Sequence, residues 1–272
     1  MITSNTNRLI KLASSLQLKK GRLQHKLFLA EGIHLVAEAL KAEAEIRCFF
    51  WSQRLCATGE GRELLQLLTT RAEGFEVSET VLGKICETET PQGIVAMLSL
   101  PQEPVFDLTG TKLGLIIDGL QDPGNVGTII RTAWAGGLDC LLFTSGTVDP
   151  FQGKVVRATM GGIFYQKIYR NLTPRMIAAA AQKAGVQIIA GTPNAVCSCF
   201  AVDLTLPTLL LVGNEGKGVT PEWENYAIRR VSIPQPGKAE SLNVSVSAGI
   251  LVYEALRQRL AVNTAKGEAS TL

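Results

Sequence analysis

Short apolar segments alternate with helix-like segments through the second half of this 272-residue chain. Four of these segments are almost entirely apolar: 113–118, 140–143, 186–190 and 208–212. Strands that are apolar along their whole length are typical of a parallel sheet whose two faces are both covered by helices. The sequence therefore predicts an α/β fold with a parallel sheet, followed by a long helix over residues 244–260.

The first hundred residues predict a second, smaller α/β unit. Apolar residues recur at helical spacing over 5–20, where we expect Gly21 to end the helix, and strand-like segments lie at 46–51 and 93–100. Residues 101–112 contain two prolines and few apolar residues, which favours a connection between domains. The expected division is an N-terminal domain at 1–104, a linker at 105–112, a C-terminal domain at 113–262 and a polar tail at 263–272.

Positive charge is concentrated at the N-terminus, although the net charge of the chain is only +3. Residues 1–30 contain no acidic residue, and their basic residues besides histidine are Arg8, Lys11, Lys19, Lys20, Arg22 and Lys26. Three interpretations are open on composition alone. The segment can be an organellar transit peptide, the solvated face of an ordinary helix, or a strip that contacts nucleic-acid phosphates.

The cysteines and histidines do not form a metal-binding or catalytic pattern. The six cysteines lack zinc spacing to His25 or His34, and both histidines lie in the basic N-terminal segment. A secretory signal is not apparent, and no apolar run approaches the roughly 20 residues that span a bilayer. We therefore expect a soluble, cytoplasmic protein with free thiols, without a bound metal and without a membrane partner.

Three turns at the ends of predicted strands combine glycine with polar side chains. They lie at 119–127, 213–218 and 234–243. Ligands of parallel sheets gather at the carboxyl ends of the strands, and glycine lets the backbone approach a ligand closely. The polar candidates in and just after these turns are Asn125, Arg131, Glu215, Ser241 and Asn243.

Each of these candidates also has an ordinary structural interpretation. Asn125 and Ser241 can cap helices, and Asn243 can form a turn. Arg131 can be a surface cation, and Glu215 can face the positive end of a helix dipole. The glycine spacing matches neither the dinucleotide fingerprint nor the P-loop, which argues against a nucleotide-dependent oxidoreductase.

The three turns resemble, in order and spacing, the three motifs of the SpoU/TrmH family. The matching stretches are Asn125-x-Gly127-x-x-x-Arg131, Val212-Gly213-Asn214-Glu215-Gly216-x-Gly218, and Ile233-Pro234 with Ser241-Leu242-Asn243-Val244-Ser245-x-x-Ala248. This family comprises the S-adenosylmethionine-dependent RNA ribose 2′-O-methyltransferases of the SPOUT superfamily. Residues 3–34 and Thr90-Pro91-Gln92-Gly93 also resemble the N-terminal substrate-binding domain of its rRNA branch, which argues against the transit-peptide interpretation.

The resemblance implies a fold, a cofactor and partners. The C-terminal domain would contain a trefoil knot and form a homodimer whose active sites draw on both subunits. S-adenosyl-L-methionine would bind in the knot, against Gly213, Ile233 and Leu242, with Gly191 and Thr192 as further candidates. The N-terminal domain would bind RNA, and its candidate phosphate contacts are Lys11, Lys19, Lys20 and Arg22.

The resemblance also implies roles for the polar residues of the turns. The family proposal makes Arg131 the base, but a guanidinium group is effectively always protonated. We expect Arg131 to bind the neighbouring RNA phosphate and stabilise the developing alkoxide, while that phosphate or water accepts the proton. Asn125 and Asn243 would orient the ribose and the knot loops, Glu215 would hold Arg131 or the partner's loop, and Ser241 would contact RNA or cap the helix.

Two further basic residues, Lys154 and Arg157, form either a second phosphate strip or a solvated helix face. The expected function is methylation of a ribose 2′-hydroxyl in ribosomal RNA of the 23S type. A tRNA 2′-O-methyltransferase, and a non-catalytic RNA-binding or ribosome-assembly protein, are the alternatives.

Overall fold

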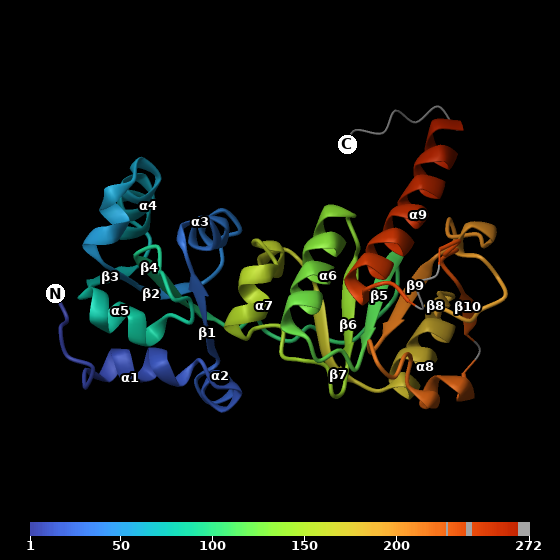
Figure 1. Ribbon diagram of the computed structural model, residues 1–272, viewed down its shortest axis with the longest axis horizontal. Coiled ribbons are helices and arrows are strands. Elements are labelled where there is room, and N and C mark those ends of the chain that lie inside the picture. The colour runs from blue at the N-terminus through green and yellow to red at the C-terminus, as the bar shows by residue number, and fades with distance from the viewer. Residues whose placement is uncertain (227, 238–240, 266–272) are drawn as a thin grey trace. The chain divides into compact units, whose positions relative to one another are not determined.

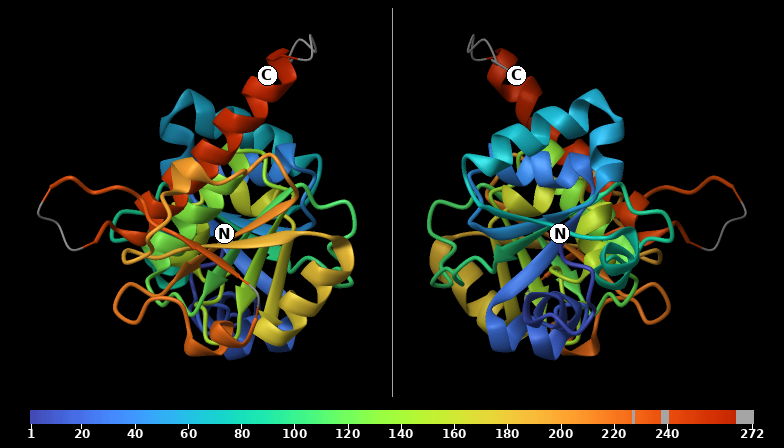
Figure 2. Two further views of the ribbon diagram at one scale, coloured as in Figure 1. Left: turned by 90° about the vertical axis from the view of Figure 1, so that its right-hand side faces the viewer. Right: turned by 90° about the vertical axis from the view of Figure 1, so that its left-hand side faces the viewer.

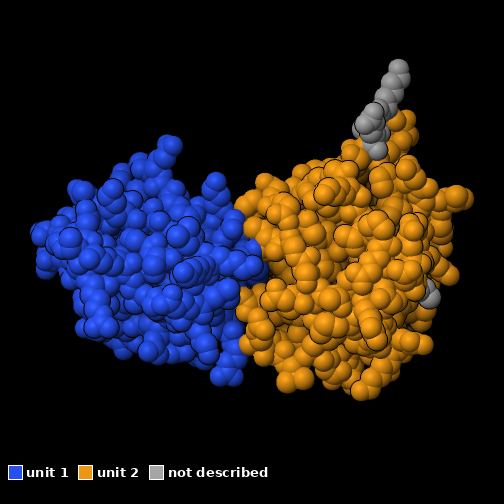
Figure 3. All heavy atoms as spheres, turned by 90° about the horizontal axis from the view of Figure 1, so that it is seen from below, with its two compact units in different colours: residues 1–102, 149–165 blue, residues 103–148, 166–272 orange. Residues whose placement is uncertain are grey.

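The computed structural model describes residues 1–226, 228–237 and 241–265. The chain divides into two compact units, shown in different colours in Figure 3. Unit 1 comprises Met1–Gln102 and Asp149–Tyr165, and unit 2 comprises Glu103–Val148 and the chain from Gln166 onward. Within the described residues, every helix is too short or too polar to cross a lipid bilayer.

Unit 2 is built on a six-stranded parallel sheet, as the apolar segments predict (Figure 1). Its strand order is β10-β8-β9-β5-β6-β7. The strands are β5 (Leu113–Asp118), β6 (Cys140–Thr144), β7 (Ile168–Leu172), β8 (Gln187–Gly191), β9 (Thr208–Gly213) and β10 (Arg229–Val231). All neighbouring strands in this sheet pair in parallel. Their carboxyl ends therefore lie along one edge of the sheet, where the glycine-rich turns begin.

Helices cover both faces of this sheet (Figures 1 and 2). One face packs against α8 (Pro174–Ala184) and the short helix η4 (Pro221–Asn225), through the buried side chains of Ile177 and Trp223. The opposite face packs against α6 (Pro123–Ala135) and α9 (Val244–Ala265), which also contact each other. A further short helix, η3, spans Cys199–Ala201. The first residues of the predicted polar tail are helical up to Ala265, and 266–272 lie outside the described residues.

Unit 1 contains a four-stranded mixed sheet in the order β1-β4-β2-β3. Its strands are β1 (Leu27–Glu31), β2 (Ile46–Trp51), β3 (Glu73–Glu76) and β4 (Ile94–Ser99). One face packs against α1 and α5 through a core that includes Ile10, Leu82 and Phe50. The helices of unit 1 are α1 (Arg8–Ser15), α2 (Lys19–His25), α3 (Ile33–Lys41), η1 (Gln53–Ala57), α4 (Gly59–Thr69), α5 (Glu79–Ile85), α7 (Gly153–Ala158) and η2 (Gly162–Phe164).

The basic N-terminal segment is folded, but Gly21 does not end a helix as expected. The first helix stops at Ser15, and Gly21 lies inside α2. A Cβ atom at Gly21 would lie 2.1 Å from the carbonyl oxygen of Ser15. The position therefore requires glycine because two successive helices meet there, and the helix pattern continues through it.

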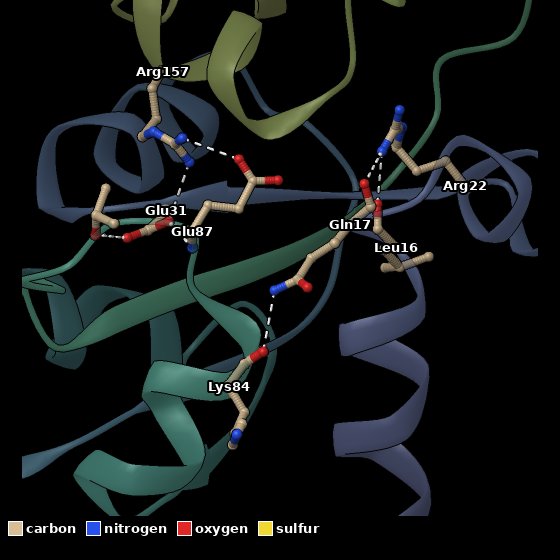
Figure 4. Close-up of polar contacts among 8 residues, drawn as sticks. Leu16, Gln17, Arg22, Glu31, Lys84, Glu87 and Arg157 are labelled. Carbon is tan, nitrogen blue, oxygen red and sulfur yellow. Dashed lines mark hydrogen bonds and ion pairs between the residues drawn. The ribbon is translucent and has the colours of Figure 1, made fainter.

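Residues 149–165 follow β6 in the sequence but pack within unit 1, an arrangement that the sequence did not indicate. Nη2 of Arg22 lies 2.8 Å from Oδ2 of Asp149, and both side chains are buried. The guanidinium group of Arg157 lies between two carboxylates (Figure 4), with Oε2 of Glu31 at 3.2 Å and Oε2 of Glu87 at 3.0 Å. Ion pairs between residues so distant in sequence hold α7 against the strands and loops of unit 1.

Candidate active site

The turn after β5 leads directly into α6 and is held by side chains from two elements. The backbone N–H of Gly119 donates to the hydroxyls of Thr144 and Thr147, each at 3.1 Å. Asp122 caps α6, since its Oδ1 accepts from the backbone N–H of Asn125 at 2.7 Å. Asp122 rather than Asn125 is thus the cap, and the amide side chain of Asn125 is free for other contacts.

The turn after β9 is closed by Asn214. Its backbone exchanges two hydrogen bonds with Gly218, at 2.9 and 2.8 Å, and its Oδ1 accepts from the backbone N–H groups of Gly216 and Lys217. Its Nδ2 donates to the carbonyl oxygen of Gly119 at 3.1 Å, which ties this turn to the turn after β5. Asn214 was not among the predicted site residues, although it lies inside the second motif.

Three predicted site residues form one hydrogen-bonded chain. Nδ2 of Asn125 donates to Oε1 of Glu215 at 2.8 Å, and Nδ2 of Asn243 donates to Oδ1 of Asn125 at 2.9 Å. Oδ1 of Asn243 accepts from the backbone N–H of Ser245 at 2.9 Å and so caps α9. Because a carboxylate only accepts, Glu215 fixes the orientation of the Asn125 amide, which in turn fixes that of Asn243.

Arg131 lies outside this chain of hydrogen bonds. It is exposed on α6, six residues after Asn125, and forms no ion pair with any residue that the structure describes. Glu215 therefore does not hold Arg131 within one copy of the chain, because its carboxylate accepts from Asn125 instead. The guanidinium group is open to a ligand or to another chain.

A cavity of about 240 Å³ lies beside the network, at the carboxyl ends of β8 and β9. All five residues that the resemblance assigns to the cofactor line it: Gly191, Thr192, Gly213, Ile233 and Leu242. Glu215 and Ser241 line it as well, so the network and the cavity share a wall. Ser241 does not cap α9, since Asn243 occupies that position.

Two glycines in the wall of this cavity have close neighbours where a Cβ atom would lie. A Cβ atom at Gly213 would lie 2.3 Å from the backbone of Gly218, and one at Gly191 would lie 2.8 Å from Cδ1 of Leu251. The wall also contains a buried acceptor, Oε1 of Gln235, which has no hydrogen-bond partner among the described residues. A buried polar atom without a partner is costly, so a ligand donor placed there would satisfy it.

The basic residues of unit 1 fall into two groups. Lys11, Lys19 and Lys20 are exposed and remain available to an anionic partner. Arg22 is buried, and besides Asp149 it donates to the carbonyl oxygens of Leu16 and Gln17 (Figure 4). A phosphate contact by Arg22 is therefore not supported, because its donors already stabilise the fold.

The same distinction separates the two basic residues of α7. Lys154 is exposed, whereas Arg157 pairs with Glu31 and Glu87 and is only partly accessible. Arg157 thus fits neither the phosphate strip nor the solvated helix face that the sequence suggested. Its ion pairs with these two glutamates hold α7 against the remainder of unit 1.

Comparison with known protein families identifies the family to which the chain belongs. Residues 112–253 match the model of the SpoU rRNA Methylase family, and residues 7–96 match that of the MRM3-like substrate binding domain. The chain belongs to the SpoU rRNA methylase family.

Individual relatives are similar over nearly the whole chain. An uncharacterized tRNA/rRNA methyltransferase from Synechocystis sp. is 35% identical, over 97% of this chain and 96% of that protein. The 23S rRNA (guanosine(2553)-2′-O)-methyltransferase RlmP of Bacillus subtilis is 36% identical, over 93% of this chain and 97% of its own. The crystal structure of the SpoU methyltransferase AviRb from Streptomyces viridochromogenes, in complex with AdoMet, is 30% identical with a TM-score of 0.83, and the match covers 94% of this chain and 99% of AviRb.

Proposed function

We propose that this chain transfers the methyl group of S-adenosyl-L-methionine to a ribose 2′-hydroxyl of ribosomal RNA of the 23S type. The observation that carries the proposal is the Glu215–Asn125–Asn243 chain of hydrogen bonds beside a cavity lined by the cofactor candidates. The family, the relative that methylates 23S rRNA and the AdoMet-bound neighbour support the same assignment.

The residues of the cavity fit S-adenosylmethionine. This molecule carries amino donors at both ends, and Oε1 of Gln235 is a buried acceptor without a partner among the described residues. Gly191 and Gly213 line the cavity without side chains of their own, and Thr192 and Ser241 add polar residues to the wall. When bound, the molecule would supply an electrophilic methyl group on a sulfonium.

The protein's contribution to the reaction is chiefly positioning. A ribose hydroxyl is a weak nucleophile, and holding it in line with the methyl group can supply most of the rate enhancement. Asn125 and Asn243 have fixed amide orientations, so they can hold the ribose and the two turns in one arrangement. We propose that the exposed Arg131 binds the adjacent RNA phosphate through two parallel hydrogen bonds and stabilises the developing alkoxide. The phosphate or water then accepts the proton.

A second copy of the chain would complete the site. Val246 and Tyr253 lie seven residues apart on α9, and each is about half exposed (50% and 51%). Residues seven apart share one helix face, so this apolar stripe is suited to burial against another protein surface. We propose that a homodimer covers the stripe and brings its own residues toward Arg131 on the adjoining α6. The trefoil knot of the family is proposed for the same unit.

Unit 1 would supply the RNA contacts that select the substrate. Its exposed Lys11, Lys19 and Lys20 can bind phosphates, and its sequence matches the substrate-binding domain model. Folded RNA is recognised mainly by shape and backbone, which suits such a domain. We propose the cytoplasm as the place of the reaction, because ribosomal RNA is the proposed substrate and the similar RlmP is a bacterial protein.

The proposal is tested by mapping ribose methylation on the ribosomal RNA of cells that lack this chain. We expect one 2′-O-methylated position of the large-subunit RNA to lose its modification and to regain it when the wild-type gene is returned. The Asn125→Ala variant should not restore it. An unchanged rRNA methylation map would contradict the proposal, and loss of a tRNA methylation instead would favour the tRNA alternative.

A further inference from the structure

A second cavity in unit 2, of about 620 Å³, has no part in the site described above. It lies between α8, the beginning of β8 and the residues Asn225, Tyr226 and Arg229, and it shares no lining residue with the first cavity. Its volume is typical of sites that bind small molecules or parts of larger ones. We call this cavity the α8 groove.

The α8 groove is basic. Arg175 and Arg229 line it from two different elements, and none of its described lining residues is acidic. Neither arginine forms an ion pair with any residue that the structure describes, whereas the adjacent Arg230 lies 3.6 Å from Glu224. Both arginines are exposed, and two guanidinium groups without carboxylate partners in one cavity are suited to bind an anionic ligand.

The position of Arg175 strengthens this inference. It occupies the first turn of α8, directly after Pro174, and that turn contains no acidic residue. A cation at the positive end of a helix dipole is unfavourable, so Arg175 does not stabilise α8. An anion bound at this place would interact favourably with both the side chain and the helix.

The remaining surface of the groove suits a planar, partly apolar group. Alanines of α8, among them Ala178 and Ala179, form part of its lining, and their small side chains leave room for a ligand on this side of the helix. Tyr226 also lines it; this partly buried residue packs against the core of unit 2, and its ring lies edge to face against that of buried Trp223, with centroids 6.2 Å apart. Aromatic rings held in this way provide stacking surfaces for unpaired bases.

We propose that the α8 groove binds a single-stranded segment of the substrate RNA, with a base on Tyr226 and flanking phosphates on Arg175 and Arg229. The occupant is RNA because phosphate and planar base together match the lining, whereas an acidic peptide would leave Tyr226 without a specific partner. The inference rests on the proposed function only in that the RNA is the methylation substrate.

The test compares two variants with the same loss of charge. Arg175→Ala/Arg229→Ala removes the two groove arginines, and Lys112→Ala/Lys183→Ala removes two lysines that do not line the groove. Binding of a 23S rRNA fragment is measured over a range of salt concentrations. For two lost single-strand phosphate contacts, the slope of log K against log salt should decrease by about 1.4. The RNA Kd should rise about tenfold for the groove variant and less than about twofold for the control.

Tyr226 gives an independent test. Tyr226→Leu should weaken RNA binding about tenfold, while Tyr226→Phe keeps the ring and should bind like wild type. Cross-linking of 4-thiouridine-substituted RNA to wild-type protein should mark a peptide containing Tyr226. S-adenosylmethionine affinity should be the same in all these proteins, because the two cavities share no residue.

The results separate this inference from the proposed function. If the groove variant binds RNA like the lysine control and no cross-link forms at the groove, the inference is wrong even when methylation proceeds normally. If wild-type protein binds RNA through the groove but methylates no ribose, the groove inference stands and the proposed function fails. If both double variants weakened RNA binding equally, the loss of affinity would result from the lower net charge of the protein, and the inference would also be wrong.

Discussion

Asn243 at the start of α9 donates a hydrogen bond of 2.9 Å to Asn125 in the first turn of α6, although the two residues are 118 positions apart in the sequence. Each of these amides has a second partner, which is Glu215 for Asn125 and the N-terminus of α9 for Asn243. The polarity of the whole chain of hydrogen bonds is therefore set at both ends, by the carboxylate of Glu215 and by the backbone N–H groups at the start of α9. This relationship links three turns into a single rigid unit beside the cavity.

Reversing that polarity gives the first prediction. Asn243→Asp keeps the cap of α9 but places an acceptor opposite the acceptor oxygen of Asn125. If the Asn125 amide rotated by about 180°, its oxygen would instead face the carboxylate of Glu215, which also only accepts hydrogen bonds. We expect the rate of methyl transfer to fall about 100-fold, since a small misplacement of reacting groups has an effect of this size. Thermal stability should change little because the cap is retained.

The double variant Asn243→Asp/Glu215→Gln is the matched control for this prediction. It allows every hydrogen bond of the chain to re-form with opposite polarity. The new amide at position 215 can donate to Asn125, and Asn125 can donate to the new carboxylate at position 243. Single-turnover rates should recover at least about tenfold over Asn243→Asp. A double variant no faster than either single variant would show that orientation is not what the network supplies.

The second prediction concerns Arg131. Lysine keeps the charge but cannot form two parallel hydrogen bonds to a phosphate. Arg131→Lys should lower the single-turnover methylation rate about 100-fold while the affinity for S-adenosylmethionine stays unchanged. Rapid-quench kinetics with saturating RNA, together with calorimetry, measure both quantities. A rate near that of wild type, with unchanged RNA affinity, would contradict the bidentate role.

The third prediction concerns two helical glycines of unit 1. Gly21→Ala should lower the free energy of unfolding by about 1–3 kcal/mol, because its Cβ would lie 2.1 Å from the carbonyl oxygen of Ser15. Gly83→Ala on α5 should raise it by about 0.5–1 kcal/mol, because a Cβ there meets nothing within 4 Å and alanine favours the helix. Urea denaturation of the two variants should therefore give shifts of opposite sign.

The fourth prediction follows from a buried thiol on the central sheet. Burial raises the pKa of Cys140 to about 12, well above the value of about 8.5 for a free thiol. The folded state thus prefers the protonated thiol, and this contribution to stability is complete below about pH 8 and is lost as the pH rises toward 12. At pH 9, iodoacetamide should label Cys140 at least about 100-fold more slowly in the native protein than in urea. Equal labelling rates would contradict the burial of this thiol.

The sequence predicted the parallel sheet well because its central strands are buried on both faces and therefore uniformly apolar. The strand Ile168–Leu172 was missed, since Arg170 and Asn171 interrupt its apolar pattern. The strand Leu27–Glu31 was also missed, because it is short and directly follows the basic residues of the N-terminal segment. Local pattern does not show either strand, because pairing with distant strands forms them.

The site shows the same limit. The motif residues lie where three strand ends meet, so their approach follows from the parallel sheet. The parallel sheet does not determine which of these residues form hydrogen bonds with each other. Glu215 accepts a hydrogen bond from Asn125, although pairing with Arg131 was one expectation. Arg22 belonged to a basic cluster in sequence, but its partner Asp149 lies 127 residues away and turns it into a structural residue. Charge patterns near in sequence do not reveal such distant partners.

Methyl transfer to a ribose is observed directly when the purified protein is incubated with methyl-labelled S-adenosylmethionine and 23S rRNA that lacks modifications, and the labelled nucleoside is identified by mass spectrometry. We predict one 2′-O-methylated nucleoside per RNA, formed by wild type and lost in the Asn125→Ala variant. A label found on a base, or no label with RNA and S-adenosylmethionine both bound, would contradict it.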